Sequence, residues 1–188
     1  MRGKPRILCL FWIGIAVMTT PASASGFALF GSYWSPHDTA DGSFGGGLMF
    51  SGSLGKVCAL DVRGSYFDRV TETSGNIDPD VQIIPLEAGL RINFLGDQPV
   101  NPFIGGGVGY YFLDTDFGEL EDEPGYYLVA GIEAGKAKGV SLLLEAIYRK
   151  VDGTIEVEPA SFLPILVDET THVDFSGFGA NVGLSWRF

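Results

Sequence analysis

The chain has 188 residues, of which 46 % are hydrophobic, 13 % are aromatic and 27 are glycine. No stretch of its body is long and apolar enough to cross a bilayer as a helix, so the apolar residues are spread over many short segments, as in a β protein. The formal net charge of −11 excludes a nucleic-acid-binding protein, which needs a basic surface.

Residues 1–24 are typical of a secretory signal peptide. Three basic residues precede the apolar run 7–18, and small residues follow it at 21–24, where signal peptidases cut. The alternative, a retained membrane anchor, needs ~20 apolar residues, and this run is shorter. Cleavage would leave nine basic against 23 acidic residues, a charge of −14. Cys58 would be the only cysteine left, so we expect neither a disulfide nor a zinc site.

Eight apolar segments follow, separated by clusters rich in Gly, Asn, Asp and Pro. Each can cross the hydrocarbon as a tilted strand, which takes ~9 to 11 residues. Their even number suits a closed antiparallel barrel with both termini on one side. The predicted strands are 26–35, 42–53, 57–70, 80–94, 101–113, 125–136, 139–151 and 172–188.

Side chains alternate along these segments between bulky apolar residues and polar or small ones. In 80–94 the apolar parity runs from Ile84 to Phe94, while Glu87 and Arg91 occupy the other parity. Because successive side chains in a strand point to opposite faces, one face is apolar. We expect lipid on the bulky face, since bulky residues would overfill a small lumen. The facing of 26–35 stays open, and a soluble sandwich is the alternative.

The links between segments also alternate in character. Short links near 54–56, 95–100 and 136–139 separate longer or more polar ones at 36–41, 71–79, 114–124 and 152–171. Small bacterial barrels have short periplasmic turns and longer outer loops. We therefore expect a periplasmic N-terminus, with the longer links outside.

Aromatic residues occur where this orientation places the two lipid headgroup levels. Two aromatic girdles are typical of membrane barrels. The expected girdle residues are Tyr66, Tyr110, Phe112, Tyr126 and Tyr148 near the outer ends, with Phe94, Trp186 and Phe188 near the periplasmic ends.

Two stretches carry a resemblance to known proteins. The segment from Pro102 to Tyr110, PFIGGGVGY, is similar to one common in small outer-membrane barrels, and the terminal Ser-Trp-Arg-Phe resembles their closing strand. The family is the eight-stranded group that includes OmpX-like proteins and the OmpA membrane domain. The resemblance implies an outer-membrane location, with Phe188 read by the insertion machinery. It implies no catalytic residue.

The parity of the strands sends four acids and four bases into the barrel. We expect them to pair and to fill the lumen, because eight strands leave room only for side chains. If the 71–79 link turns about Gly75, Arg63 and Glu87 face each other. A proton or small-ion path through these charges is the functional alternative. The predicted interior residues are Asp61, Arg63, Glu87, Arg91, Glu133, Glu145, Arg149 and Arg187.

Other chemistry has weaker support in the sequence. The glycine runs 45–47 and 105–107 are not followed by the Lys-Ser/Thr of a phosphate loop. Acidic residues crowd the links 114–124 and 152–171, where hard oxygen ligands would suit Ca²⁺ or Mg²⁺, although a solvated surface explains them as well.

An enzyme that modifies lipid A would have to use one of the two histidines. His37 lies near Asp38 and Ser35, and His172 lies near Glu169 and Ser176 in sequence, but a nucleophile needs a base within hydrogen-bond reach.

We therefore predict an all-β, eight-stranded antiparallel up-and-down transmembrane β-barrel over residues 25–188. We expect no catalytic, cofactor or metal residues. The expected partners of this monomer are outer-membrane lipid, lipopolysaccharide and the insertion machinery, with an unidentified surface ligand at the acidic loops. A lipid A-modifying enzyme and a narrow ion channel are the alternatives.

Overall fold

The computed structural model describes residues 25–37, 42–55, 57–71, 80–96, 98–115, 123–135, 139–156 and 170–188. The predicted signal peptide, residues 1–24, lies outside this part of the chain. None of the described segments forms a helix long and apolar enough to cross a membrane. The strands are β1 (Ser25–Pro36), β2 (Ser43–Ser53), β3 (Cys58–Thr71), β4 (Asp80–Asn93), β5 (Val100–Thr115), β6 (Glu123–Gly135), β7 (Gly139–Glu156), β8 (Thr170–Asp174) and β9 (Gly177–Arg187).

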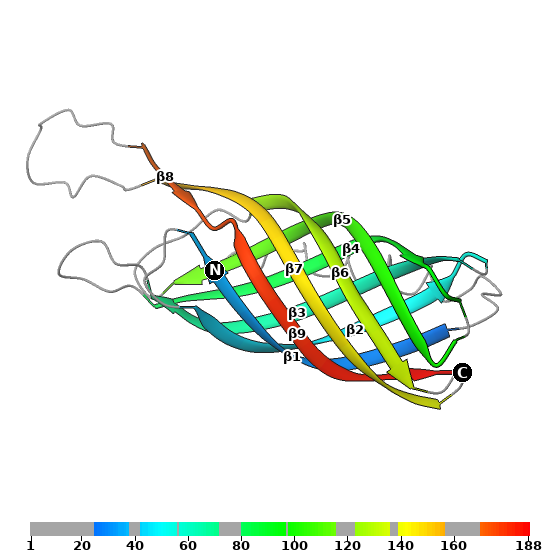
Figure 1. Ribbon diagram of the computed structural model, residues 1–188. Coiled ribbons are helices and arrows are strands. Elements are labelled where there is room, and N and C mark those ends of the chain that lie inside the picture. Colours follow the sequence, from blue (N-terminus) through cyan, green and yellow to red (C-terminus); the bar gives the residue numbers. More distant parts are fainter. Residues whose placement is uncertain are drawn as a thin grey trace, which may run out of the picture.

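Eight of these strands close into one antiparallel barrel. Each strand from β1 to β7 pairs with the next, and β9 pairs with both β7 and β1. The last strand therefore closes the barrel against the first, with Gly26 opposite Arg187 and Pro36 opposite Gly177. Figure 1 shows the strands tilted across the barrel wall. The predicted eight-stranded up-and-down barrel is confirmed.

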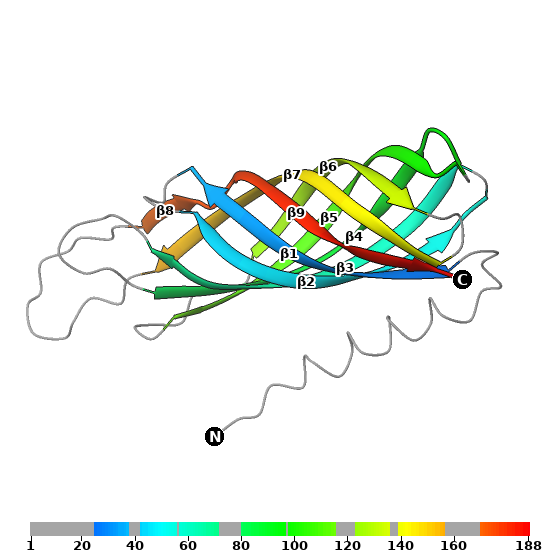
Figure 2. The same ribbon diagram turned by 60° about the horizontal axis from the view of Figure 1, so that its bottom comes forward.

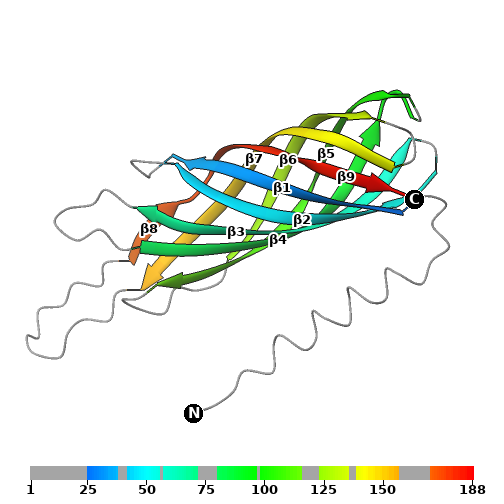
Figure 3. The same ribbon diagram turned by 90° about the horizontal axis from the view of Figure 1, so that it is seen from below.

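The two ends of the barrel differ. At the end next to the C-terminus, short turns join the strands, and Gly55 (φ 126°) and Gly96 (φ 56°) adopt backbone angles that favour glycine. We call this the turn end. The strand ends that border the four longer links lie at the opposite end, which we call the loop end, and β8 lies there too (Figures 2 and 3).

The last predicted strand, 172–188, is not continuous. It consists of β8 and β9, with Phe175 and Ser176 between them outside either strand. Both residues form hydrogen bonds with Val151 of β7. The Phe175 amide donates to the Val151 carbonyl, and the Val151 amide donates to the Ser176 hydroxyl. Beyond this break, β8 pairs with residues 152–156 of β7, so these two strands continue the wall as a β7–β8 ribbon.

The outer wall is apolar. Leu90 is 56 % exposed, and Ile92, Leu142 and Leu184 are between 43 and 46 % exposed, whereas the inward Glu87 is 1 % exposed. A soluble barrel would bury the first four and expose the carboxylate. This arrangement suits hydrocarbon on the outside and decides against the soluble sandwich.

The lumen is filled, and here one expectation was wrong. Large side chains were expected outside because they would overfill a small barrel, but aromatic side chains from β1, β3, β5 and β6 point inward. In β1, whose facing stayed open, Phe30 is 5 % exposed and Trp34 is fully buried. The inward aromatic residues of the strands are Phe30, Trp34, Phe67, Phe103, Tyr111 and Tyr127.

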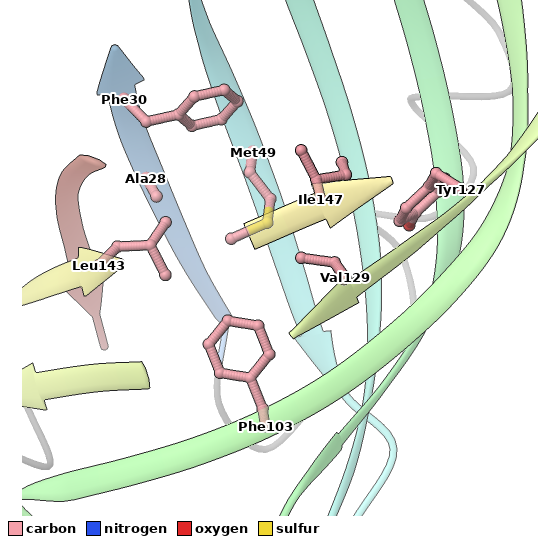
Figure 4. Close-up of a cluster of buried hydrophobic side chains, with 8 residues drawn as sticks. All are labelled: Ala28, Phe30, Met49, Phe103, Tyr127, Val129, Leu143 and Ile147. Atoms are coloured by element: carbon pink, nitrogen blue, oxygen red, sulfur yellow. The ribbon is translucent and has the colours of Figure 1, made fainter. Parts of the chain in front are cut away.

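The buried apolar residues form two groups. Figure 4 shows the mid-barrel cluster, whose side chains converge from several strands on one space. The loop-end cluster lies nearer the longer links. The mid-barrel cluster comprises Ala28, Phe30, Met49, Phe103, Tyr127, Val129, Leu143 and Ile147. The loop-end cluster comprises Trp34, Phe67, Ile83, Tyr111, Leu113, Val151 and Phe175.

Candidate functional site: the filled lumen

Glycines of the wall make room for the inward aromatic rings. A Cβ added to Gly47 would lie 2.6 Å from the ring of Phe30, and one added to Gly89 would lie 2.5 Å from the hydroxyl of Tyr127. Such distances are far below van der Waals contact. The inward glycines, which we call socket glycines, therefore leave the space that large side chains occupy. This explains how a narrow barrel holds six aromatic rings.

The first ion pair lies next to the loop-end cluster, because its arginine contacts two rings of that cluster. Arg149 Nε is 2.9 Å from Glu87 Oε1, and neither side chain is exposed. The hydroxyl of Tyr111 donates to the same oxygen at 2.9 Å. The Arg149 guanidinium carbon lies 5.2 Å from the ring centre of Trp34 and 5.5 Å from that of Phe67. Charge and aromatic faces thus stabilise the arginine together.

A second pair crosses the middle of the lumen. Arg63 Nη1 lies 3.2 Å from Glu145 Oε2, and the two side chains are 1 % and 0 % exposed. Asn181 donates to the same carboxylate oxygen at 2.8 Å and accepts from Ser32 at 2.6 Å. The Arg63 guanidinium also lies over the ring of Tyr127, 5.0 Å from its centre.

The third group lies toward the turn end and joins four charges. Arg91 Nε is 3.3 Å from Asp61 Oδ2, and its Nη1 is 3.8 Å from Glu133 Oε2. Glu133 also pairs with Arg187 and accepts from Ser185. Arg187 is the most open member, with 20 % of its side chain exposed. The guanidinium carbon of Arg91 lies 4.9 Å from the ring centre of Phe103.

The structure thus places all eight predicted interior charges in the lumen. Arg63 and Glu87 are opposite one another on β3 and β4, as expected. Their salt bridges nevertheless run to Glu145 and Arg149 on β7. The guanidinium is long enough to span a narrow barrel, so a partner across the lumen competes with the neighbour on the next strand.

Several buried polar atoms of the described residues have no hydrogen-bond partner. Three are on successive inward positions of β3: Asp61 Oδ1, Arg63 Nε and Ser65 Oγ. Buried polar atoms of this kind are commonly satisfied by ordered water.

Of the two histidines, the structure describes the side chain of His37 alone. The ring Nδ1 of His37 lies 2.8 Å from the backbone carbonyl of Ser176, not from a hydroxyl. The Ser176 hydroxyl accepts from the amide of Val151. The side chain of His172 and the neighbouring Glu169 and Asp38 lie outside the described part.

The predicted girdle residues all lie on the outer wall by strand parity. Near the loop end, Tyr66, Tyr110 and Tyr126 are 45, 40 and 51 % exposed, and Phe112 and Tyr148 are partly exposed. Near the turn end, Phe94 and Phe188 are 57 and 66 % exposed. Trp186 stacks on Phe27 across the seam between β9 and β1, with ring centres 4.8 Å apart.

The acidic links are mostly outside the described residues, so the structure describes no site in them. Among the residues that it does describe, no three His, Cys, Asp or Glu side chains are grouped to hold a metal ion.

Residues 7–188 match the family model of the outer membrane protein beta-barrel domain. The chain belongs to this family. The members of this family are bacterial outer-membrane proteins, so this chain is located in the bacterial outer membrane. The predicted membership of the small eight-stranded outer-membrane barrels is confirmed.

Solved structures with the same fold agree with this assignment. The outer membrane protein OprG of Pseudomonas aeruginosa superposes with a TM-score of 0.73 at 16 % identity, covering 88 % of this chain and 95 % of its own. Neisserial surface protein A (NspA) gives 0.61 at 12 % identity, covering 88 % and 96 %. The N-terminal barrel domain of P. aeruginosa OprF gives 0.54 at 10 % identity, covering 88 % and 97 %. No curated protein matches the sequence.

The sequence revealed the charges inside the barrel but not the aromatic residues beside them. Tyr127 and Val129 share the inward parity with Glu133, and Leu143 and Ile147 share it with Glu145. The signal was the glycine content: in register, Gly45 lies opposite Phe67, Gly47 opposite Phe30 and Gly107 opposite Tyr127.

Proposed function

We propose that this outer-membrane barrel is a closed, rigid platform, and that its longer links act at the cell surface in a structural or binding role. The observation that carries the proposal is the lumen, where three groups of buried ion pairs lie among two clusters of buried apolar side chains and leave little room for solute. A rigid barrel positions loops well for binding, because the strands fix the loop ends.

The proposal includes the partners expected from the sequence. The barrel contacts outer-membrane lipid and lipopolysaccharide, is inserted by the outer-membrane assembly machinery through its terminal strand and Phe188, and acts as a monomer without cofactor, metal or catalytic residue. The acidic links face the medium and carry the surface ligand site.

Planar-bilayer recordings test the closed lumen. We expect the purified full chain to show no large, steady conductance. A double variant, Trp34→Ala with Phe67→Ala, removes two rings of the loop-end cluster and should produce measurable openings. The paired variant Leu90→Ala with Leu184→Ala, on the outer wall, should stay closed. Large steady currents from the unmodified protein would contradict the proposal.

A pull-down tests the surface role. The chain with residues 152–171 shortened should insert normally but lose capture of host or bacterial surface components that the intact chain retains. Equal capture by the two chains would assign binding to another part of the molecule.

A narrow proton path is the second candidate, favoured by the three unpartnered polar atoms along β3. It would move protons without large currents. Liposomes containing a pH-sensitive dye would show proton entry with the unmodified chain and slower entry with Asp61→Asn. Equal rates with protein-free liposomes would dismiss this candidate.

A further inference from the structure

Three polar atoms on the inner face of β3 lack a hydrogen-bond partner among the described residues. They are Asp61 Oδ1, Arg63 Nε and Ser65 Oγ, and none of these residues is more than 4 % exposed. Because the residues alternate along one strand, they lie on the same face, about 6.6 Å apart along it. An unpartnered buried polar atom is costly. The three atoms therefore mark a place for a small polar ligand inside the barrel.

The chemistry of the three atoms selects the ligand. The carboxylate oxygen of Asp61 accepts hydrogen bonds, Arg63 Nε donates, and the Ser65 hydroxyl does both. A cation would be repelled by Arg63, and an anion would be repelled by Asp61. Water donates and accepts, so it suits all three atoms. It also adds no charge to a lumen whose ion pairs already join four acids to four bases.

The next inward residue of β3 closes this face toward the loop end. Phe67 is fully buried in the loop-end cluster, where its ring centre lies 5.3 Å from that of Trp34. Ser65, two residues earlier, is still 4 % accessible to water. Space of the size of a water molecule therefore reaches Ser65 and stops at the phenylalanine ring.

Toward the turn end the ion pairs of the lumen become more accessible. The side chains of Glu87 and Arg149, next to the loop-end cluster, are both 0 % exposed. Those of Asp61 and Arg91 are 2 % and 6 % exposed, and that of Arg187 is 20 % exposed. Water therefore enters this face of the lumen from the turn end.

We propose that the inner face of β3 binds a single file of ordered water, which begins at Asp61, passes Arg63 and ends at Ser65 beneath Phe67. The spacing of these positions takes roughly two to three molecules, because each hydrogen bond spans about 2.8 Å. The file has no exit at the loop end, so it holds water but carries no protons through the barrel. This distinguishes it from the narrow proton path. The inference rests on the proposed closed lumen.

Nuclear magnetic resonance of the isotope-labelled full chain in nanodiscs tests whether the water is bound. The rotating-frame Overhauser effect between water and the Arg63 Nε–H has a sign that separates bound water from proton exchange. We expect this contact in the unmodified chain. Its absence would overturn the inference.

Two variants of equal bulk test where the water lies. Ser65→Val fills the end of the file and should weaken the water contact at Arg63, because the neighbouring water loses its space and a partner. Ser32→Val is the matched control, since the Ser32 hydroxyl already donates to Asn181. It should leave the contact unchanged. Circular dichroism verifies folding, and if Ser65→Val does not fold, Ser65→Ala should weaken the same contact. An unchanged contact in the folded Ser65 variant would overturn the inference.

Liposomes containing a pH-sensitive dye test where the file ends. We expect no proton entry with the unmodified chain and entry with Phe67→Ala, because the file then continues to the loop end. Adding Ser65→Val to Phe67→Ala should abolish entry, whereas adding Ser32→Val should not. Entry with the unmodified chain, none with Phe67→Ala, or equal entry with the two double variants would overturn the inference. Large steady currents from the unmodified chain would instead contradict the closed lumen, and the water contact at Arg63 is measured independently of them.

Discussion

At the scale of single residues, the lumen combines charges that are costly to bury with rings that hold them. The carboxylate of Glu87 forms an ion pair with Arg149 and accepts a hydrogen bond from the hydroxyl of Tyr111. The guanidinium of Arg149 lies over the rings of Trp34 and Phe67. Such a pair contributes little net stability over a well-packed apolar pair, but the loss of one partner leaves an uncompensated charge.

Glu87→Gln should therefore lower the free energy of unfolding by ~3 to 5 kcal/mol, measured by urea unfolding in lipid vesicles. Glu87→Gln combined with Arg149→Met removes both charges and should be less destabilised than the sum of the single changes. Additive effects of the two substitutions would show that the pair is not coupled.

The socket glycines make a second prediction at this scale. Gly89→Ala places a methyl group against the Tyr127 hydroxyl and the backbone carbonyl of Gly106. We expect a loss of ~1 to 3 kcal/mol in the same unfolding measurement. Gly64→Ala is the matched control on the outward face, where the nearest atom would be 4.0 Å away, and it should be nearly neutral.

At the scale of elements, the break between β8 and β9 separates barrel from ribbon. At this break the Val151 carbonyl accepts from the Phe175 amide, and the Val151 amide donates to the Ser176 hydroxyl. The backbone amide and the ring Nδ1 of His37 both bond the Ser176 carbonyl, at 2.8 Å each. These bonds replace ladder bonds that a continuous strand would make. The barrel wall and the β7–β8 ribbon are thus joined at one fixed point.

Ser176→Ala should loosen this point, because the Val151 amide loses its acceptor. We expect faster hydrogen exchange at Val151, corresponding to ~1 kcal/mol, with little change at Leu143 in the middle of β7. Exchange that accelerates equally at both positions would indicate global destabilisation instead.

At the scale of the whole molecule, closure depends on the contact of the first strand with the last. Gly26 to Pro36 pair with Arg187 to Gly177 across nearly the full chain length. The stacked rings of Phe27 and Trp186 lie on this seam. The ring centre of Phe188 lies 6.1 Å from that of Phe27. Contacts so distant in sequence form late and slowly.

Phe27→Ala and Trp186→Ala should each destabilise the barrel, and the double variant should show a coupling energy of ~0.5 to 1.5 kcal/mol from the stacked pair. Unfolding of all four proteins in vesicles measures it. The pair Tyr148 and Phe178, which lies between β7 and β9 instead of at the closing seam, provides a comparison for aromatic contacts elsewhere.

The sequence by itself determined the barrel, its strand number and the facing of most strands. Side-chain parity is a local property, so Glu87 and Leu90 could be assigned to opposite faces from the order of residues alone. The same parity indicated that eight charges would share the interior. The family resemblance followed from short motifs in β5 and β9.

Only the tertiary structure decided which charges meet and what fills the space between them. The partner of Arg63 depends on how far each strand is shifted along its neighbours around the barrel, which no single segment encodes. The same stagger sets Gly47 opposite Phe30 and so allows bulky rings inside.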